Sequence, residues 1–171
     1  MTIAGAALHS TERAGGLFQR LLPRRLGNLY GGHRLAIWLL VPVVATRLAM
    51  GANSVVNTRF VASGPDAIPL STYDPAAAQA VISLFALLGL SHLLVALQGV
   101  IVLVRYRALV PLFYLLLLAH ALGAQALLAA RPIAAATPGF GVSLSLVLLA
   151  ATVAGFVLSL APSAIPSQGV R

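Results

Sequence analysis

The chain has 171 residues, of which 60% are hydrophobic and 8% are charged, and its formal net charge is +8. A soluble domain carries about 25% charged residues, so a water-soluble fold is excluded. Cysteine is absent, which excludes disulfides, iron–sulfur clusters and cysteine-ligated zinc.

Residues 1–34 are predicted to form a basic cytoplasmic tail ahead of the first long apolar stretch. Within residues 11–22, leucine and phenylalanine side chains would share one face of a helix, with Arg13 and Arg20 toward the other, until Pro23 ends the run. Such a helix would lie at the membrane surface, where its arginines would meet anionic lipid headgroups. A disordered basic tail fits the same residues, and the sequence does not choose between the two.

Four apolar stretches follow, at residues 35–53, 77–104, 108–130 and 140–161. Each is close to the ~20 residues that a helix needs to cross ~30 Å of hydrocarbon. The sequence therefore predicts an all-α, polytopic membrane domain over residues 35–161, built as an antiparallel bundle of four transmembrane helices. Residues 162–171 would form a short cytoplasmic tail. Because only Arg105, Tyr106 and Arg107 join the second and third stretches, those two spans are predicted to be antiparallel neighbours.

The distribution of arginine predicts the orientation. If the N-terminus is cytoplasmic, eight arginines lie on that side of the membrane, and only Arg59 and Arg131 lie on the far side. This agrees with the positive-inside rule, so both termini are predicted to be cytoplasmic. Lysine is absent from the sequence, a bias typical of bacterial genomes rich in G and C, and we therefore expect a bacterial inner membrane. Nucleic acid is not an expected partner, because the arginines flank the spans and no basic surface is interleaved with aromatic residues.

The outer segment between the first two stretches is too apolar for a fully solvated linker. Phe60, Ile68 and Leu70 predict that it folds back over the mouth of the bundle. Asp74 directly precedes Pro75 and is predicted to cap the second helix.

The fourth stretch carries a stripe of small residues. Its members recur at alternating spacings of four and three: Gly141, Ser145, Leu148, Thr152, Gly155 and Ser159. Small residues let helices approach closely in lipid. Packing within the bundle is the favoured interpretation, and association into a homodimer or a larger membrane complex is the alternative.

Three basic side chains lie deep inside the apolar stretches: Arg47, His92 and His120. Each lies thirteen residues from an arginine that flanks its stretch, namely Arg34, Arg105 and Arg107 in turn. At ~1.5 Å per residue, this spacing is roughly 20 Å of helix. The three are therefore predicted to share one depth near the middle of the membrane.

Arg47 has no counter-charge within the spans. A midplane arginine costs ~2.5–3.5 kcal/mol on insertion scales, so it should face the bundle interior and have a partner. All three acids, Glu12, Asp66 and Asp74, fall outside the spans. The remaining candidates are backbone carbonyls, the amides of Asn53, Gln98 or Gln125, an acid brought in by the outer segment, an anionic ligand, or a neighbouring subunit.

His92, His120 and Arg47 are the candidate cofactor-binding residues. Two neutral imidazoles on adjacent helices could hold one b-type haem axially, and any of the three side chains could donate a hydrogen bond to a quinone carbonyl. Zinc and di-metal centres are not expected, because those sites use three or four ligands that include carboxylate or thiolate. The simpler interpretation is that each histidine hydrogen-bonds a neighbouring helix, with Ser91, Gln98 or Gln125 as candidate companions.

The layout of one span, an outer segment, two spans joined by a short basic turn and a last span resembles that of the small bacterial DoxX-like membrane proteins. The segment Leu103 to Leu112, with sequence LVRYRALVPL, carries most of the likeness, which would cover residues 35–160. The resemblance implies a four-helix bundle in a bacterial inner membrane and transfers no site residue. The function favoured by the sequence is an accessory or structural membrane component without catalysis. The alternative is a redox subunit that binds one b-type haem or a quinone between the second and third spans.

Overall fold

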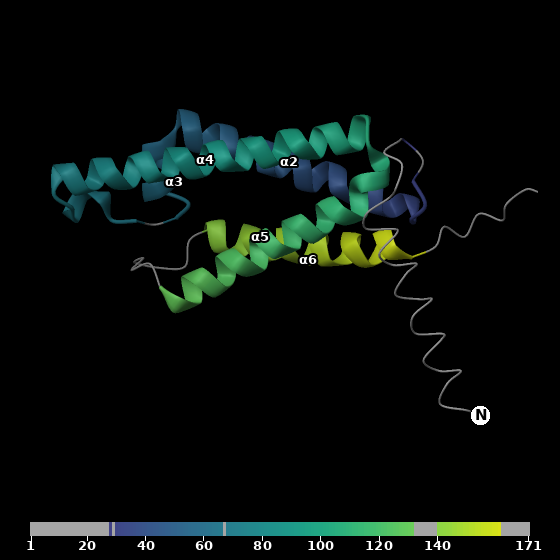
Figure 1. The fold of residues 1–171 in the computed structure, drawn as a ribbon. Coiled ribbons are helices and arrows are strands. Elements are labelled where there is room, and N and C mark those ends of the chain that lie inside the picture. The colour runs from purple at the N-terminus through teal and green to yellow at the C-terminus, as the bar shows by residue number, and fades with distance from the viewer. Residues whose placement is uncertain (1–27, 29, 67, 132–139, 162–171) are drawn as a thin grey trace, which may run out of the picture.

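The computed structural model describes residues 28, 30–66, 68–131 and 140–161 (Figure 1). Its regular structure is entirely helical, with no β-strand in these residues. Four helices are long and apolar enough to cross a membrane: α2 (Arg34–Val56), α4 (Pro75–Val104), α5 (Val110–Ala130) and α6 (Phe140–Leu160). The prediction of an all-α chain with four such helices is confirmed. The surface helix predicted within residues 11–22 and the tail at residues 162–171 lie outside the described residues.

The helix ends follow from local sequence. Asp74 caps α4, because its side-chain oxygen accepts a 3.0 Å hydrogen bond from the Ala76 N–H while Pro75 occupies the first turn, which confirms the predicted cap. His33 caps α2 in the same way, with its Nδ1 accepting a 3.2 Å hydrogen bond from the Leu35 N–H. Between the long helices lie the short helix α3 (Thr58–Ser63) and the single 3₁₀ turns η1 (Leu70–Thr72) and η2 (Arg107–Leu109).

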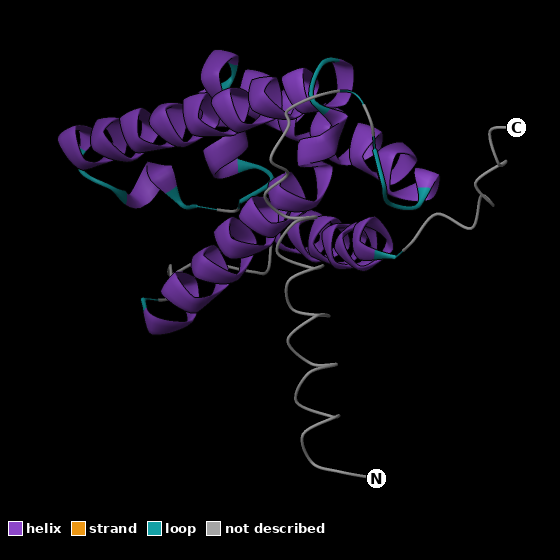
Figure 2. Ribbon diagram, turned by 45° about the vertical axis from the view of Figure 1, so that its right-hand side comes forward, coloured by secondary structure: helices purple, strands orange, loops and turns teal. Residues whose placement is uncertain are grey.

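The four long helices pack in the order α4, α2, α6 and α5 (Figures 1 and 2). Helix α2 lies along α4 and also packs on α6, and α5 crosses α6. Helices α4 and α5 share few contacts, and α5 runs away from α4 after the η2 turn. The short connection led us to predict that α4 and α5 are neighbours, whereas the main partner of α4 is α2.

Two glycines account for the close pairing of α2 with α4. A Cβ atom added at Gly51 would lie 2.8 Å from the backbone nitrogen of Leu93 and 2.9 Å from the carbonyl oxygen of Gly89. One added at Gly89 would lie 2.6 Å from the Cβ of Ser54. Helices in lipid associate through such close backbone approach, because lipid provides no hydrophobic drive. The glycine contact therefore holds α4 on α2 and leaves α5 free to diverge.

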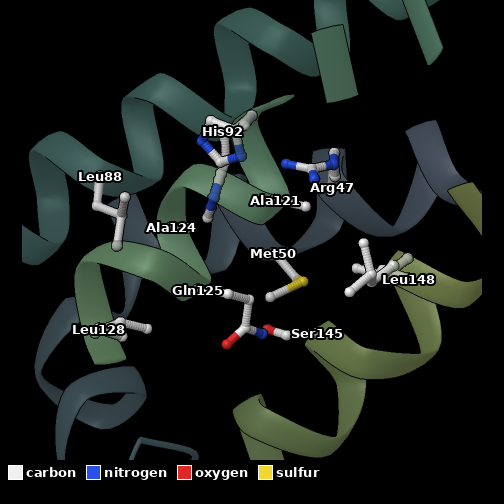
Figure 3. Close-up of a pocket in the computed structure, with 12 residues that line it drawn as sticks. Arg47, Met50, Leu88, His92, Ala121, Ala124, Gln125, Leu128, Ser145 and Leu148 are labelled. Carbon is white, nitrogen blue, oxygen red and sulfur yellow. The ribbon is translucent and has the colours of Figure 1, made fainter. Parts of the chain in front are cut away.

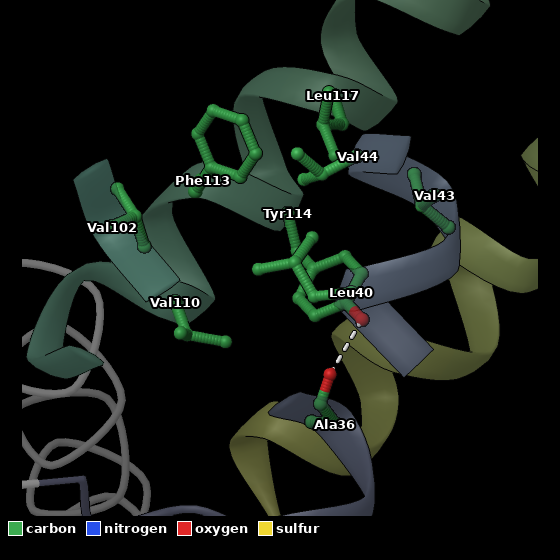
Figure 4. Close-up of a cluster of buried hydrophobic side chains, with 9 residues drawn as sticks. All are labelled: Ala36, Leu40, Val43, Val44, Val102, Val110, Phe113, Tyr114 and Leu117. Atoms are coloured by element: carbon green, nitrogen blue, oxygen red, sulfur yellow. Dashed lines mark hydrogen bonds between the residues drawn. The ribbon is translucent and has the colours of Figure 1, made fainter. Parts of the chain in front are cut away.

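The main apolar core lies around Tyr114, near the η2 end of the helices, with nine buried side chains from α2, α4 and α5 (Figure 4). The Tyr114 hydroxyl donates a 2.7 Å hydrogen bond to the carbonyl oxygen of Ala36. On α6, Gly155 packs directly against the Tyr114 ring, and Thr152 and Ser159 are buried. This part of the small-residue stripe therefore packs within the chain, as the sequence favoured.

The outer segment packs back against α4. Ala62, Ile68 and Leu70 form a second buried cluster, with Phe85 of α4 against it. The fold-back expected from the apolar residues is therefore present, although Phe60 itself is 66% exposed. Asp66 is half-buried in this segment, and loss of hydration there raises the pKa of its carboxyl group.

Candidate ligand-binding site

A cavity of about 230 Å³ lies among the four long helices (Figure 3). The packed core includes Val44 and Leu117, and the cavity begins one helical turn further along, at Arg47 and His120. Its lining comes from α2 (Arg47 and Met50), α4 (Leu88 and His92), α5 (His120, Ala121, Ala124, Gln125 and Leu128) and α6 (Ser145, Leu148 and Leu149). The structure therefore brings all three candidate residues of the sequence, Arg47, His92 and His120, to one cavity.

Arg47 is buried in this cavity without a partner for its Nε atom. The side chain is 8% exposed, and Nε has no hydrogen-bond partner among the described residues. Figure 3 shows the guanidinium group pointing from α2 toward His92. The folded-back outer segment does not neutralise it, because neither Asp66 nor Asp74 lines the cavity.

The amides considered as partners of Arg47 lie in different places. Asn53 accepts a 2.8 Å hydrogen bond from Asn57, on the exposed side of α2. Gln98 is exposed and lies outside the cavity lining, whereas Gln125 lines it. Of the three, Gln125 alone lies where it could share a bound group with Arg47.

His92 and His120 face each other across α4 and α5. Their ring centroids are 5.9 Å apart and their planes meet at 68°, an edge-to-face arrangement. The equal spacing in the sequence predicted a common depth but could not predict that the rings meet. Ser91, one of the proposed companions, instead donates a 3.0 Å hydrogen bond to the Leu87 carbonyl of its own helix.

Exposed lining residues on α4 and α5 indicate that the cavity opens between these two helices. Leu88 on α4 is 47% exposed and Leu128 on α5 is 45% exposed, although both line the cavity. Ala124, one turn before Leu128 on α5, is also exposed. Because these helices have the length and composition of membrane spans, the opening would face the hydrocarbon of the bilayer.

Met50 and the apolar wall from α6 were not predicted from the sequence. Met50 follows Arg47 by three residues and so shares its helical face, a signal that was present in the sequence. Leu149 carries no such signal, because every stretch is rich in leucine. Ser145 was noted for packing in the small-residue stripe and lies instead in the cavity lining.

The lining supplies hydrogen-bond donors around one fixed positive charge. A guanidinium, two imidazoles, an amide and a hydroxyl converge, and the described residues that line the cavity include no carboxylate or thiolate. Within the described residues no three metal-ligating side chains cluster. The volume of about 230 Å³ is below the ~300–1,000 Å³ of pockets that hold drug-sized molecules, so the cavity would have to enlarge to hold a tetrapyrrole.

Compared with protein-family models, curated proteins and solved structures, the chain matches none of them. The likeness to DoxX-like proteins therefore stays a prediction from layout, and the cavity itself carries the functional proposal.

Proposed function

We propose that the chain is an accessory protein of a bacterial inner membrane that holds a lipid-soluble molecule in its central cavity. Four helices of membrane-spanning composition support the location. The excess of arginine on one side of the spans supports cytoplasmic termini and an antiparallel order of helices. The proposal extends the favoured prediction of a non-catalytic component by giving it a ligand.

The observation that carries the proposal is the unpartnered Arg47. A buried arginine in a span costs ~2.5–3.5 kcal/mol on insertion scales, and such side chains normally pair. In the described chain its Nε has no partner, and the cavity beside it is lined with further donors. A ligand with acceptor oxygen atoms would supply the missing partner.

A redox role with a quinone is the second candidate. The edge-to-face rings of His92 and His120, with centroids 5.9 Å apart, lie beside Arg47 and could donate to a quinone carbonyl. A b-type haem is less well supported, because its macrocycle would have to separate the two rings and enlarge the cavity.

The presence and kind of the bound ligand are tested on protein that is purified in mild detergent together with its native lipids. We expect no Soret band in oxidised and dithionite-reduced spectra, and about one extractable lipophilic molecule per chain by mass spectrometry. Arg47→Leu should lose that molecule, while Arg59→Leu, which removes an exposed arginine on α3, should retain it. A Soret band that disappears in His92→Ala and in His120→Ala would establish haem instead. No stoichiometric molecule in the wild type would refute the proposed function.

The proposed orientation is tested separately by cysteine labelling. The sequence contains no cysteine, so the label reports only on the residue that is introduced. Ser71→Cys, in the exposed part of the outer segment, should react with a membrane-impermeant maleimide in intact spheroplasts. Asn28→Cys, at an exposed position before α2, should react only after lysis. The reverse pattern would invert the orientation.

A further inference from the structure

We propose that the occupant of the cavity is a single-chain amphiphile with a carboxylate head, the chemistry of a long-chain fatty acid. This inference rests on the proposed ligand-binding function and names its ligand class. The carboxylate would lie against Arg47, and the acyl chain would leave between α4 and α5.

The positive charge of Arg47 favours a ligand with an anionic head group. Arg47 is a permanent cation that is only 8% exposed, and in the described part of the chain its Nε has no partner and no carboxylate lines the cavity. The planar guanidinium presents parallel N–H groups that match a carboxylate in a bidentate arrangement. A neutral carbonyl, as in a quinone, would accept a hydrogen bond but leave the charge uncompensated. An anion therefore fits the cavity better than a neutral ligand.

The depth of Arg47 in the membrane favours a weak acid over a phospholipid as the ligand. Arg47 lies thirteen residues from Arg34, roughly 20 Å along the helix from the flanking position. A phosphodiester keeps its charge at every physiological pH, so carrying it to this depth is unfavourable. A carboxylic acid can cross hydrocarbon as the neutral acid and ionise beside the cation. The proton returns to water, because a second positive charge on His92 or His120 beside Arg47 would be unfavourable.

The shape of the cavity selects a ligand with one chain. A volume of about 230 Å³ accommodates the head and the first methylenes but not a diacyl lipid. The rest of the chain has an apolar exit past Leu88 and Leu128, which line the cavity and are 47% and 45% exposed. A small carboxylate such as acetate could pair with Arg47 as well, but it has no acyl chain that would concentrate it in the bilayer.

The test compares four probes on the delipidated full-length protein in non-ionic detergent, with the thermal unfolding midpoint and equilibrium binding as readouts. The probes are hexadecanoic acid, hexadecanol with the same chain and no charge, acetate with the same head and no chain, and a short-chain benzoquinone. Hexadecanoic acid should raise the midpoint and bind saturably, and hexadecanol and acetate should bind roughly tenfold more weakly or worse. The acid should lose its effect in Arg47→Leu and keep it in Arg59→Leu.

A second variant guards against a poorly folded Arg47→Leu. Ala124→Trp leaves the arginine in place but fills the exposed opening on α5, and it should also abolish the effect of hexadecanoic acid. If hexadecanol or acetate binds as tightly as hexadecanoic acid, the proposal of a carboxylate amphiphile is overturned. Arg47-dependent binding of the quinone without binding of the acid would overturn it too, while leaving the proposed ligand-binding function intact. Binding of none of the probes, in a protein that carries no native lipophile, would overturn both.

Discussion

Replacing Gly51 with alanine should weaken the pairing of α2 with α4, because the added methyl group meets backbone that cannot rotate away. The nearest atoms, Leu93 nitrogen at 2.8 Å and Gly89 oxygen at 2.9 Å, would have to retreat by about 0.6 Å to reach an ordinary contact of 3.4 Å. A gap of that size forfeits roughly a quarter to a half of the dispersion energy along the contact. Overpacking of this kind costs ~1–3 kcal/mol, against a gain of ~1 kcal/mol from replacing glycine in a helix, so we expect a net loss of up to about 2 kcal/mol.

The chain offers a matched control in Gly123, where a Cβ atom would meet nothing within 4 Å. Unfolding by increasing SDS, followed by far-ultraviolet circular dichroism, should show Gly51→Ala less stable than the wild type and Gly123→Ala unchanged or slightly more stable. Gly51 adjoins Met50 and Leu93 adjoins His92, so Gly51→Ala should also weaken retention of the ligand. Equal stability of the two variants would refute the close approach of α2 and α4.

Two further predictions concern polar groups outside the cavity. Tyr114→Phe should lower the stability in SDS by ~0.5–1.5 kcal/mol, because it removes the hydrogen bond to the Ala36 carbonyl, whereas Tyr30→Phe should cost nothing, because the buried Tyr30 hydroxyl has no partner in the described residues. A loss of stability in both variants would contradict this distinction. Asp66→Asn should stabilise the protein near pH 7, because burial raises the carboxyl pKa and the wild type loses stability as pH rises through that value. Thermal scans against pH should show the gain vanish below the ordinary value of 3.8, and a gain that does not depend on pH would contradict the assignment.

The number and length of the membrane helices could be predicted because hydrocarbon imposes them. Without water, each backbone N–H must bond within its own helix, so an apolar stretch of about 20 residues has one favourable structure. The cap at Asp74 was also predictable, because it depends on a side chain and a proline next to each other in the sequence.

The pairing of helices could not be predicted from connection length. The Arg105 to Arg107 turn constrains only the ends of α4 and α5, while the contact at Gly51 and Gly89 acts along the middle of α4 and holds it on α2. Glycine is common in this chain, so the sequence does not show which glycines meet.

The depth of the candidate site could be predicted from the sequence, but the directions of its side chains could not. Equal spacing from flanking arginines placed Arg47, His92 and His120 at one depth, and the structure gathers them at one cavity. Which way a side chain points around its helix depends on packing, so the meeting of the two rings came only from the structure. The contribution of Met50 could have been found from its place on the helical face of Arg47.

The central claim is that Arg47 has no counter-charge among the residues that the structure describes. The most direct measurement is the stability of delipidated Arg47→Leu against delipidated wild type in the same detergent. If the arginine is unpaired, the variant should be more stable, because a buried cation without a partner is replaced by an apolar side chain, and added hexadecanoic acid should stabilise the wild type alone. If delipidated Arg47→Leu is instead less stable than the wild type, the arginine already has a partner within the chain and the central claim is contradicted.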